Sequence, residues 1–257
     1  MIFETHAHYD DKAFDDDREE LLRKLPEEGI KYVVNVAANM EGSKKNLEII
    51  NKFNYFFGTV GVHPCDTTEL NEKTFKELEE MSKHEKIVAI GEIGLDYYWD
   101  EPDRNIQKEW FVKQIELAKK VGKPIVVHSR DAAKDTLEII KNTKAYEIGG
   151  VIHCFSYGVE MAREYLNMGY YIGVGGVVTF KNGRKLKEVV EYAPLEKIVL
   201  ETDCPYLAPV PFRGKRNDST KLSYVVDAIA EIKNVDREMV MKTTMKNACD
   251  MYRIELK

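Results

Sequence analysis

Two histidines stand one residue apart near the start of the chain, in the segment ETHAHYDD. His6 and His8 fall in an apolar run that is typical of a β-strand, where residues i and i+2 point to the same face. Two imidazoles on one face could bind a divalent metal ion. The pair alone is a weak signal, because a lone strand-end histidine more often makes a structural hydrogen bond.

Further side chains that can bind metals occur at the ends of other short apolar runs. They are Glu92 in AIGEIGLDYY, His128 in VVHSRD, His153 in VIHCFS and Asp203 in LETDCP. With His6 and His8 they make six candidate metal ligands, more than one tetrahedral ion needs, so the set predicts two divalent ions. The histidine-rich composition of the set would suit zinc or manganese. Among the histidines of the chain, only His84 lies in a helical, surface-like segment.

Eight strand-like runs alternate with amphipathic stretches along the chain. We expect strands at residues 2–8, 31–38, 56–64, 86–95, 123–129, 149–155, 170–178 and 197–203. Runs that are apolar almost throughout are typical of parallel strands buried on both faces. The pattern shows no linker-like change in composition and predicts one domain, residues 1–257, with the α/β fold of a (β/α)₈ TIM barrel. An open doubly wound sheet is the alternative, and it would not bring the first and eighth strands together.

In such a barrel the carboxyl ends of all strands meet at one mouth, where active sites are built. The six candidate ligands would therefore converge there from five strands. This convergence is a much stronger indication of a metal site than any of the histidines taken separately.

The composition narrows the class of protein. The chain has 257 residues, of which 44% are hydrophobic, and it carries a net charge of −6. No run is long and apolar enough for a membrane span, and no signal-peptide core is visible, so we expect a soluble cytoplasmic protein. Its four cysteines form no CxxC pair and are expected to be free thiols. The acidic charge does not favour binding a long duplex, so an anionic substrate would meet a local basic patch.

The chain resembles the TatD family of metal-dependent deoxyribonucleases, within the amidohydrolase-like barrel superfamily. The matching blocks are ETHAHYDD, GVHPCD, AIGEIGLDYYWD, KPIVVHSRDA, VIHCFS, GYYIGVGGVVTFKNG, IVLETDCPYLAPVPFRGKRN and TTMKNACDMYRI. The resemblance implies a TIM barrel in which His6, His8 and Asp203 hold one ion. It assigns His128 and His153 to the other ion, with Glu92 bridging the two, and it favours magnesium.

A phosphodiesterase reaction follows from this ligand set. Two ions would lower the pKa of a bound water and neutralise charge on the phosphoryl oxygens. Asp203 is the candidate to accept the proton of the attacking water, and Glu92 belongs to the same catalytic group. His63, which ends the third strand-like run, is expected to contact the scissile phosphate or to protonate the leaving oxygen.

Contacts to DNA are expected from loops at the same end of the barrel. The candidates are His63, Arg130, Trp99, Arg213, Lys215 and Arg216. Trp99, in DYYWD, could stack on a base or could pack against the next helix. So few cations favour single-stranded ends and exonucleolytic cleavage. Neither an obligate protein partner nor an oligomeric state can be inferred.

Three departures from the family pattern affect details of the site. Glu4 replaces the usual aspartate and is expected on the same side as His6, DSTKLSYVV follows GKRN, and HCFSY replaces HCFSG. Two other functions stay open. One is a metal-dependent amidohydrolase or aminoacyl-tRNA deacylase acting on a carbonyl centre. The other is a metal-binding scaffold without catalysis.

Overall fold

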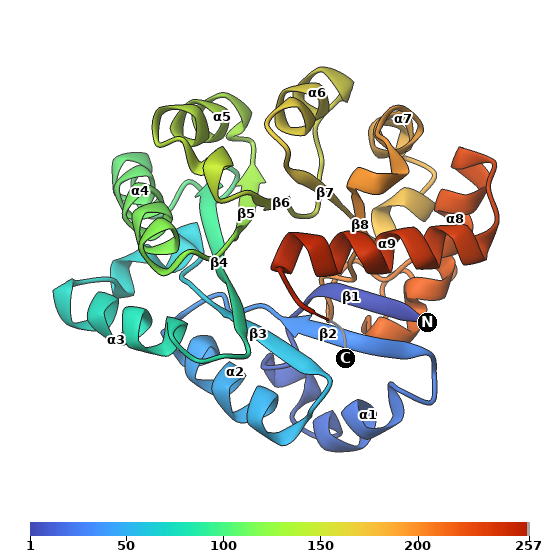
Figure 1. Ribbon diagram of the computed structural model, residues 1–257, viewed down its shortest axis with the longest axis horizontal. Coiled ribbons are helices and arrows are strands. Elements are labelled where there is room, and N and C mark those ends of the chain that lie inside the picture. Colours follow the sequence, from blue (N-terminus) through green and yellow to red (C-terminus); the bar gives the residue numbers. More distant parts are fainter. Residues whose placement is uncertain (256–257) are drawn as a thin grey trace.

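The computed structural model describes residues 1–255 and contains eight parallel strands arranged in sequential order. The strands are β1 (Ile2–Ala7), β2 (Ile30–Asn35), β3 (Phe56–Val60), β4 (Ile87–Asp96), β5 (Ile125–Arg130), β6 (Gly150–Ile152), β7 (Tyr171–Val174) and β8 (Ile198–Leu200). Each strand pairs in parallel with the next along the chain. Figure 1 shows the strands around a common centre.

The sheet closes between the first and last strands, just beyond the end of β8. Ala7 and Cys204 form a parallel bridge. On either side of it, the Asp203 amide donates to the His6 carbonyl at 3.0 Å and the His8 amide donates to the Cys204 carbonyl at 2.9 Å. The predicted barrel is therefore confirmed, and the open-sheet alternative is wrong.

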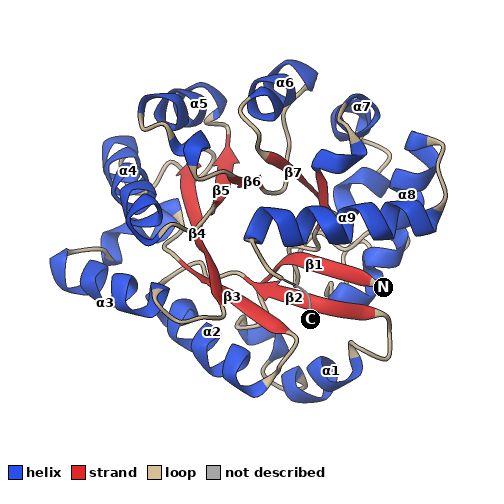
Figure 2. Ribbon diagram, viewed as in Figure 1, coloured by secondary structure: helices blue, strands red, loops and turns tan. Residues whose placement is uncertain are grey.

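Helices surround the strands, as Figure 2 shows. They are α1 (Arg18–Lys24), α2 (Met40–Lys52), α3 (Glu72–Ser82), α4 (Arg104–Val121), α5 (Ala133–Asn142), α6 (Val159–Asn167), α7 (Arg184–Tyr192), α8 (Leu222–Lys233) and α9 (Arg237–Tyr252). Several of them bury an apolar stripe. In α7, for example, Leu186, Val189 and Val190 are buried at the i, i+3, i+4 spacing of one helical face.

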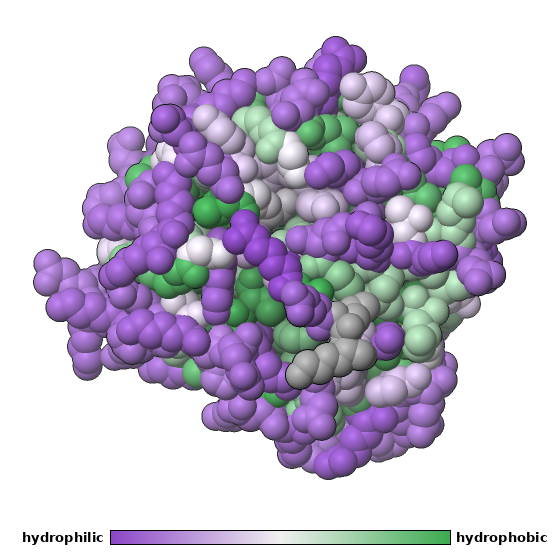
Figure 3. Space-filling view, in the orientation of Figure 1, coloured by the Kyte–Doolittle hydropathy of each residue, from purple (hydrophilic) through white to green (hydrophobic). Residues whose placement is uncertain are grey.

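Apolar side chains from the strands fill one end of the barrel. Phe3, Val34, Val88, Val126, Val151 and Val199 form a buried cluster with Ala248, Met251 and Tyr252 of α9. The Tyr252 hydroxyl donates to the Thr5 carbonyl at 2.8 Å, which fixes α9 across this end (Figure 1). Figure 3 views the same end and shows a mostly hydrophilic periphery with hydrophobic surface nearer its centre. Polar chemistry is thereby left to the opposite, carboxyl end.

Two further expectations concern cysteines and membranes. All four cysteines are free thiols, as the sequence predicts. Among the helices of residues 1–255, none combines the length and the apolar character that crossing a bilayer requires.

Candidate metal centre

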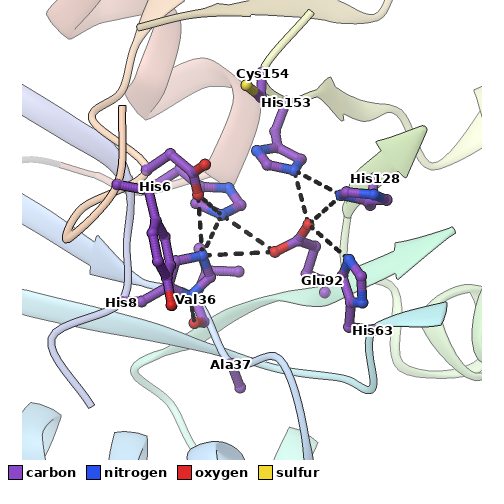
Figure 4. A network of polar contacts seen from close by, with 12 residues as sticks. His6, His8, Val36, Ala37, His63, Glu92, His128, His153 and Cys154 are labelled. Atoms are coloured by element: carbon purple, nitrogen blue, oxygen red, sulfur yellow. Dashed lines mark hydrogen bonds and ion pairs between the residues drawn. The ribbon is translucent and has the colours of Figure 1, made fainter. Parts of the chain in front are cut away.

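The six predicted ligands and His63 gather at the carboxyl end of the barrel. Figure 4 labels His63 and all of these ligands except Asp203. His6 lies in β1, Glu92 in β4 and His128 in β5. His8, His63, His153 and Asp203 follow the ends of β1, β3, β6 and β8. The chain leaves the strand ladder sooner than predicted at all four of these ends, so these side chains are held by the residues that follow the strands.

One group of donor atoms comes from β1 and the loop after β8. The Nε2 atoms of His6 and His8 are 3.1 Å apart. Oδ1 of Asp203 lies 3.2 Å from Nε2 of His8 and 3.7 Å from Nε2 of His6. These three atoms therefore face a common point.

The second group centres on the buried Glu92 carboxylate. Its Oε1 lies 2.7 Å from Nδ1 of His128 and 2.7 Å from Nε2 of His153. Those two nitrogens are 3.3 Å apart. Its other oxygen, Oε2, lies 3.4 Å from Nε2 of His6 and 3.7 Å from Nε2 of His8. Glu92 thus presents one oxygen to each group, as a bridging carboxylate would.

The donor sets fit divalent ions. Metal–ligand bonds of ~2.0–2.1 Å place neighbouring ligands about 3.3 Å apart in a tetrahedral site. The separations from 2.7 to 3.7 Å in the two groups bracket that value. Each group combines imidazole nitrogen with carboxylate oxygen, a mixture that suits zinc, manganese or iron and, for the oxygen ligands, magnesium.

Irregular backbone aims two of these side chains. Between Glu4 and Ala7, β1 advances three residues while its partner β2 advances two. Between Ile90 and Ile93, β4 likewise has one residue more than its partner β5. Such bulges interrupt the alternation of a strand and redirect side chains. The first bulge contains His6 and the second contains Glu92.

The β1 bulge also corrects the expectation for Glu4. Its carboxylate accepts hydrogen bonds from the amides of His6 and Thr202 and from the Ser219 hydroxyl, each at 3.0 Å. Glu4 therefore joins β1 to the strand-eight loop through backbone groups, and its bonds do not go to the His6 ring. Burial raises the pKa of Glu4 to about 8.

Asp96, which the sequence analysis did not single out, holds His128 from behind. Its Oδ2 lies 3.0 Å from Nε2 of His128, while Nδ1 of that ring faces Glu92. Outer carboxylates of this kind fix the orientation of a metal-binding imidazole. The available signal was the position of Asp96, which follows Glu92 in the motif GEIGLD.

Gly94 lies in β4 opposite His128 of β5, and it allows these two strands to come close. Its φ is +151°, and a Cβ there would lie 1.9 Å from the carbonyl oxygen of His128. Only glycine fits such a contact without moving β5. The glycine between Glu92 and Asp96 is thus part of how His128 is positioned.

Three imidazoles bind a proton more tightly than an ordinary histidine when the ions are absent. One is His153, whose pKa is raised, against its burial, by the charge of Glu92. Burial alone would lower the pKa of His8, but the hydrogen bond and charge of Asp203 raise it to about 10. For His128 burial has the same effect, and it is outweighed by Asp96 and Glu92, which raise the pKa to about 9. A cation in the site would replace these protons.

Other side chains of the site already have the protonation state that metal binding requires, a neutral imidazole or an ionised carboxylate. Burial and the neighbouring His153 lower the pKa of His6 to about 4, so this ring is neutral. Burial would raise the pKa of Glu92, but the charge of His153 and the hydrogen bond from His128 keep it well below its ordinary value. Burial and His128 lower the pKa of His63 to about 3.

All of the predicted ligands except His6 line a cavity of about 980 Å³. Of the predicted DNA contacts, His63, Trp99 and Arg130 line this cavity, and Trp99 is 64% exposed. Tyr206, which the sequence analysis missed, lines it from the loop after β8 and is 57% exposed. The motif CPYLAP placed it three residues beyond Asp203.

The other predicted DNA contacts lie outside the lining of this cavity. Arg213, Lys215 and Arg216 are not among the residues that line the cavity. Arg213 stacks over the Phe180 ring at 4.1 Å. Arg216 binds both carboxylate oxygens of Asp17, at 2.7 and 2.5 Å, and the Ala13 carbonyl at 2.8 Å. Arg216 therefore fastens the loop after β8 to the loop after β1.

Comparison with known proteins places this site in a family. The family model described as TatD related DNase matches residues 3–253. The chain is 42% identical to the Bacillus subtilis protein named uncharacterized metal-dependent hydrolase YabD, over 99% of this chain and 100% of that one. It is 33% identical to uncharacterized metal-dependent hydrolase YcfH of Escherichia coli, over 99% and 97% of the two chains.

Solved structures agree. The Escherichia coli TatD homologue YJJV superposes with a TM-score of 0.93 at 26% identity, covering 99% of this chain and 98% of that one. A TatD family hydrolase of Entamoeba histolytica gives 0.89 at 26% identity, covering 98% and 97%. These matches extend over nearly the whole chain and confirm the resemblance inferred from its motifs. The chain therefore belongs to the TatD-related DNase family of metal-dependent hydrolases.

Proposed function

We propose that the chain is a deoxyribonuclease that uses two divalent ions to hydrolyse phosphodiester bonds at single-stranded DNA ends. The observation that carries this proposal is the sharing of Glu92 between two donor groups on the wall of an open cavity. A bridging carboxylate is typical of paired-metal hydrolases, in which both ions act on one phosphoryl group.

The chain would hold one ion with His6, His8 and Asp203 and the other with His128 and His153, with Glu92 between them. When bound, the ions would supply an activated water and neutralise negative charge that develops on the phosphoryl oxygens. Family resemblance favours magnesium, while the imidazole-rich donor set favours zinc or manganese.

Asp203 is suited to accept the proton of the attacking water. Its Oδ1 faces His8 at 3.2 Å, and the carboxylate lines the cavity. Burial would raise its pKa, but the hydrogen bond and charge of His8 lower it below the ordinary value. Asp203 is therefore an anion at neutral pH, free to take a proton as the water attacks phosphorus.

His63 is suited to hold the scissile phosphate through its Nε2–H. The Cys65 amide donates to Nδ1 of His63 at 3.2 Å, which places the ring proton on Nε2. Since its pKa is lowered to about 3, the ring is neutral at pH 7. A neutral imidazole donates a hydrogen bond but is a poor source of a proton, so of its two expected roles we propose phosphate contact.

Exposed aromatic rings on two sides of the cavity would hold a single strand. Trp99 follows β4 and Tyr206 follows β8, and these strands lie opposite each other in a barrel of this order. Beside Trp99, the Arg130 guanidinium stacks 3.8 Å from the centre of the Tyr98 ring. Bases stack on such rings with little sequence preference.

The charges around the cavity favour contact with a few phosphates of a strand end over contact with many phosphates of a duplex. Arg130, Lys12 and Lys45 line it, but so do the carboxylates of Asp10, Asp11, Glu41 and Asp66. Duplex binding over many phosphates needs a continuous basic surface. A strand end that places a few phosphates beside the ions needs much less.

The test is digestion of single-stranded DNA labelled at its 5′ or its 3′ end, with magnesium, manganese or zinc, with and without chelator. RNA of the same sequence and an aminoacyl ester are the comparison substrates. We expect metal-dependent release of mononucleotides from one end, lost at least 100-fold in Glu92→Gln and retained in His84→Ala, a histidine outside the site.

Cleavage of the ester with no cleavage of DNA under any metal would refute the nuclease proposal and favour the deacylase. Equal cleavage by Glu92→Gln and the unmodified chain would refute the role of the shared carboxylate.

A further inference from the structure

Three buried polar atoms lie behind the donor groups without a hydrogen-bond partner among the described residues. They are Nδ1 of His6, Nδ1 of His153 and Oε2 of Glu201. A buried polar group without a partner destabilises the folded chain. Their occurrence in adjacent residues indicates an interaction that the chain is built to make.

The three side chains converge at one place. One nitrogen from each ring and one carboxylate oxygen of Glu201 lie within 4.8 Å of one another. The His6 and His153 rings are stacked, with centres 4.0 Å apart and planes 12° apart. Their Nε2 atoms face Glu92 at 3.4 and 2.7 Å (Figure 4), which leaves Nδ1 of each ring for an outer partner.

Glu201 is held in place by the backbone around it. Its Oε1 accepts a hydrogen bond from the Cys154 amide, the residue after His153. On the neighbouring strand, a Cβ at Gly173 would lie 2.3 Å from Oε2, so β7 leaves room for the carboxylate by having no side chain there. With 1% of its surface exposed, Glu201 cannot reach a substrate.

We propose that Glu201 is a positioning residue that accepts hydrogen bonds from the Nδ1–H groups of His6 and His153, directly or through one water, when the ions are bound. A proton held on Nδ1 leaves the Nε2 lone pair of each ring free for a metal. This inference rests on the proposed use of both histidines as ligands, but it does not depend on what the substrate is.

The arrangement links the two metal sites. His6 belongs to the donor group with Asp203, and His153 belongs to the group with His128 and Glu92. One carboxylate therefore sets the tautomer of a ligand in each. Loss of this carboxylate should weaken the binding of both ions together. Loss of a ligand that serves one ion would weaken the binding of that ion alone.

Glu201→Gln tests the inference because it replaces one hydrogen-bond acceptor of the side chain by a donor and hardly changes the size or shape of the side chain. Its oxygen can still accept from the Cys154 amide, so the NH₂ group faces the two rings and donates where a proton acceptor was. That favours a proton on Nε2, which blocks metal binding. We expect Zn²⁺ affinity, measured by competition with a chromophoric chelator, to fall 10- to 100-fold at both sites.

Glu4→Gln is the matched control. Glu4 is equally buried and lies on the neighbouring strand β1, but it accepts from backbone amides and the Ser219 hydroxyl. We expect its Zn²⁺ affinity to stay within threefold of the unmodified chain. An equal loss in both variants would overturn the inference, because it would reflect general damage to the barrel.

A second measurement does not require the variant to fold. In the unmodified Zn²⁺-loaded protein with ¹⁵N-labelled histidine, two-bond ¹H–¹⁵N spectra should show His6 and His153 protonated at Nδ1 and metal-bound at Nε2. Metal binding through Nδ1 of either ring would overturn the inference. Both tests read metal binding alone, so a failure of the nuclease proposal would leave their results interpretable.

Discussion

Raising the pH should tighten metal binding at both sites, because protons and metal ions compete for the same imidazoles. In the metal-free protein the pKa of His8 is raised to about 10 by Asp203, against its burial. That of His128 is raised to about 9 by Asp96 and Glu92, again against burial. The protonated forms therefore dominate at neutral pH, and each ring must lose a proton before its nitrogen can bind a metal.

The size of the effect follows from those values. At pH 7 deprotonation costs about 4 kcal/mol at His8 and about 3 kcal/mol at His128, at 1.36 kcal/mol for each pH unit below the pKa. Each cost falls as the pH rises towards the pKa. Between pH 6.5 and 8.5 we therefore expect the affinity of each site to increase about 100-fold, with at least one proton released per ion.

Titration calorimetry with Zn²⁺ in two buffers of different ionisation enthalpy counts the protons released. Chelator competition at pH 6.5, 7.5 and 8.5, corrected for protonation of the chelator, gives the affinities. Asp96→Asn removes one of the two carboxylates that raise the pKa of His128, so fewer protons should be released per protein. An affinity that does not change with pH, or release of no protons, would refute the assignment of His8 and His128 as protonated ligands.

Two other predictions concern the rim of the cavity and the β4–β5 contact. Trp99→Ala and Tyr206→Ala should each weaken binding of a nuclease-resistant single-stranded oligonucleotide about tenfold in fluorescence anisotropy, because stacking contributes ~1–3 kcal/mol per base. Trp110→Phe, at a ring packed on Phe75, should leave binding unchanged. Gly94→Ala should lower the free energy of unfolding by about 3 kcal/mol or more in urea, because its Cβ would overlap the His128 carbonyl. Gly122→Ala, where φ is +68° with no atom within 4 Å, should cost only about 1–2 kcal/mol, and equal losses at both glycines would contradict this reasoning.

The architecture could be predicted because it depends on pattern. Eight apolar runs in alternation with amphipathic stretches leave few folds besides a barrel, and strand-end residues of a barrel share one mouth. That is why His6, His128 and Asp203, far apart in the chain, could be expected together. Strand ends were predicted less well, since His63, His153 and Asp203 continue apolar runs but lie in loops.

Side-chain partners in long loops could not be predicted from position. The segment FRGKRN follows the strand that ends near Asp203, which suggested cations at the mouth. In the folded chain Arg216 meets Asp17, 199 residues earlier, and forms a two-point hydrogen bond with it. A charged side chain near a site is available to a ligand only if the fold offers it no closer partner, and composition does not contain that information.

The bulges explain why alternation along β1 predicted the shared face of His6 and His8 but not the contacts of Glu4. A regular β1 would place Glu4 and His6 on one face, but the extra residue between Glu4 and Ala7 sends Glu4 to backbone amides while His6 keeps facing His8 at 3.1 Å. The same irregularity in β4 carries Glu92, whose two oxygens serve both donor groups. A bulge requires one strand to gain a residue relative to its neighbour, so it depends on the pairing of two distant segments. The ligand types could therefore be read from the sequence, whereas the geometry that makes Glu92 a shared ligand arises only when the strands pair.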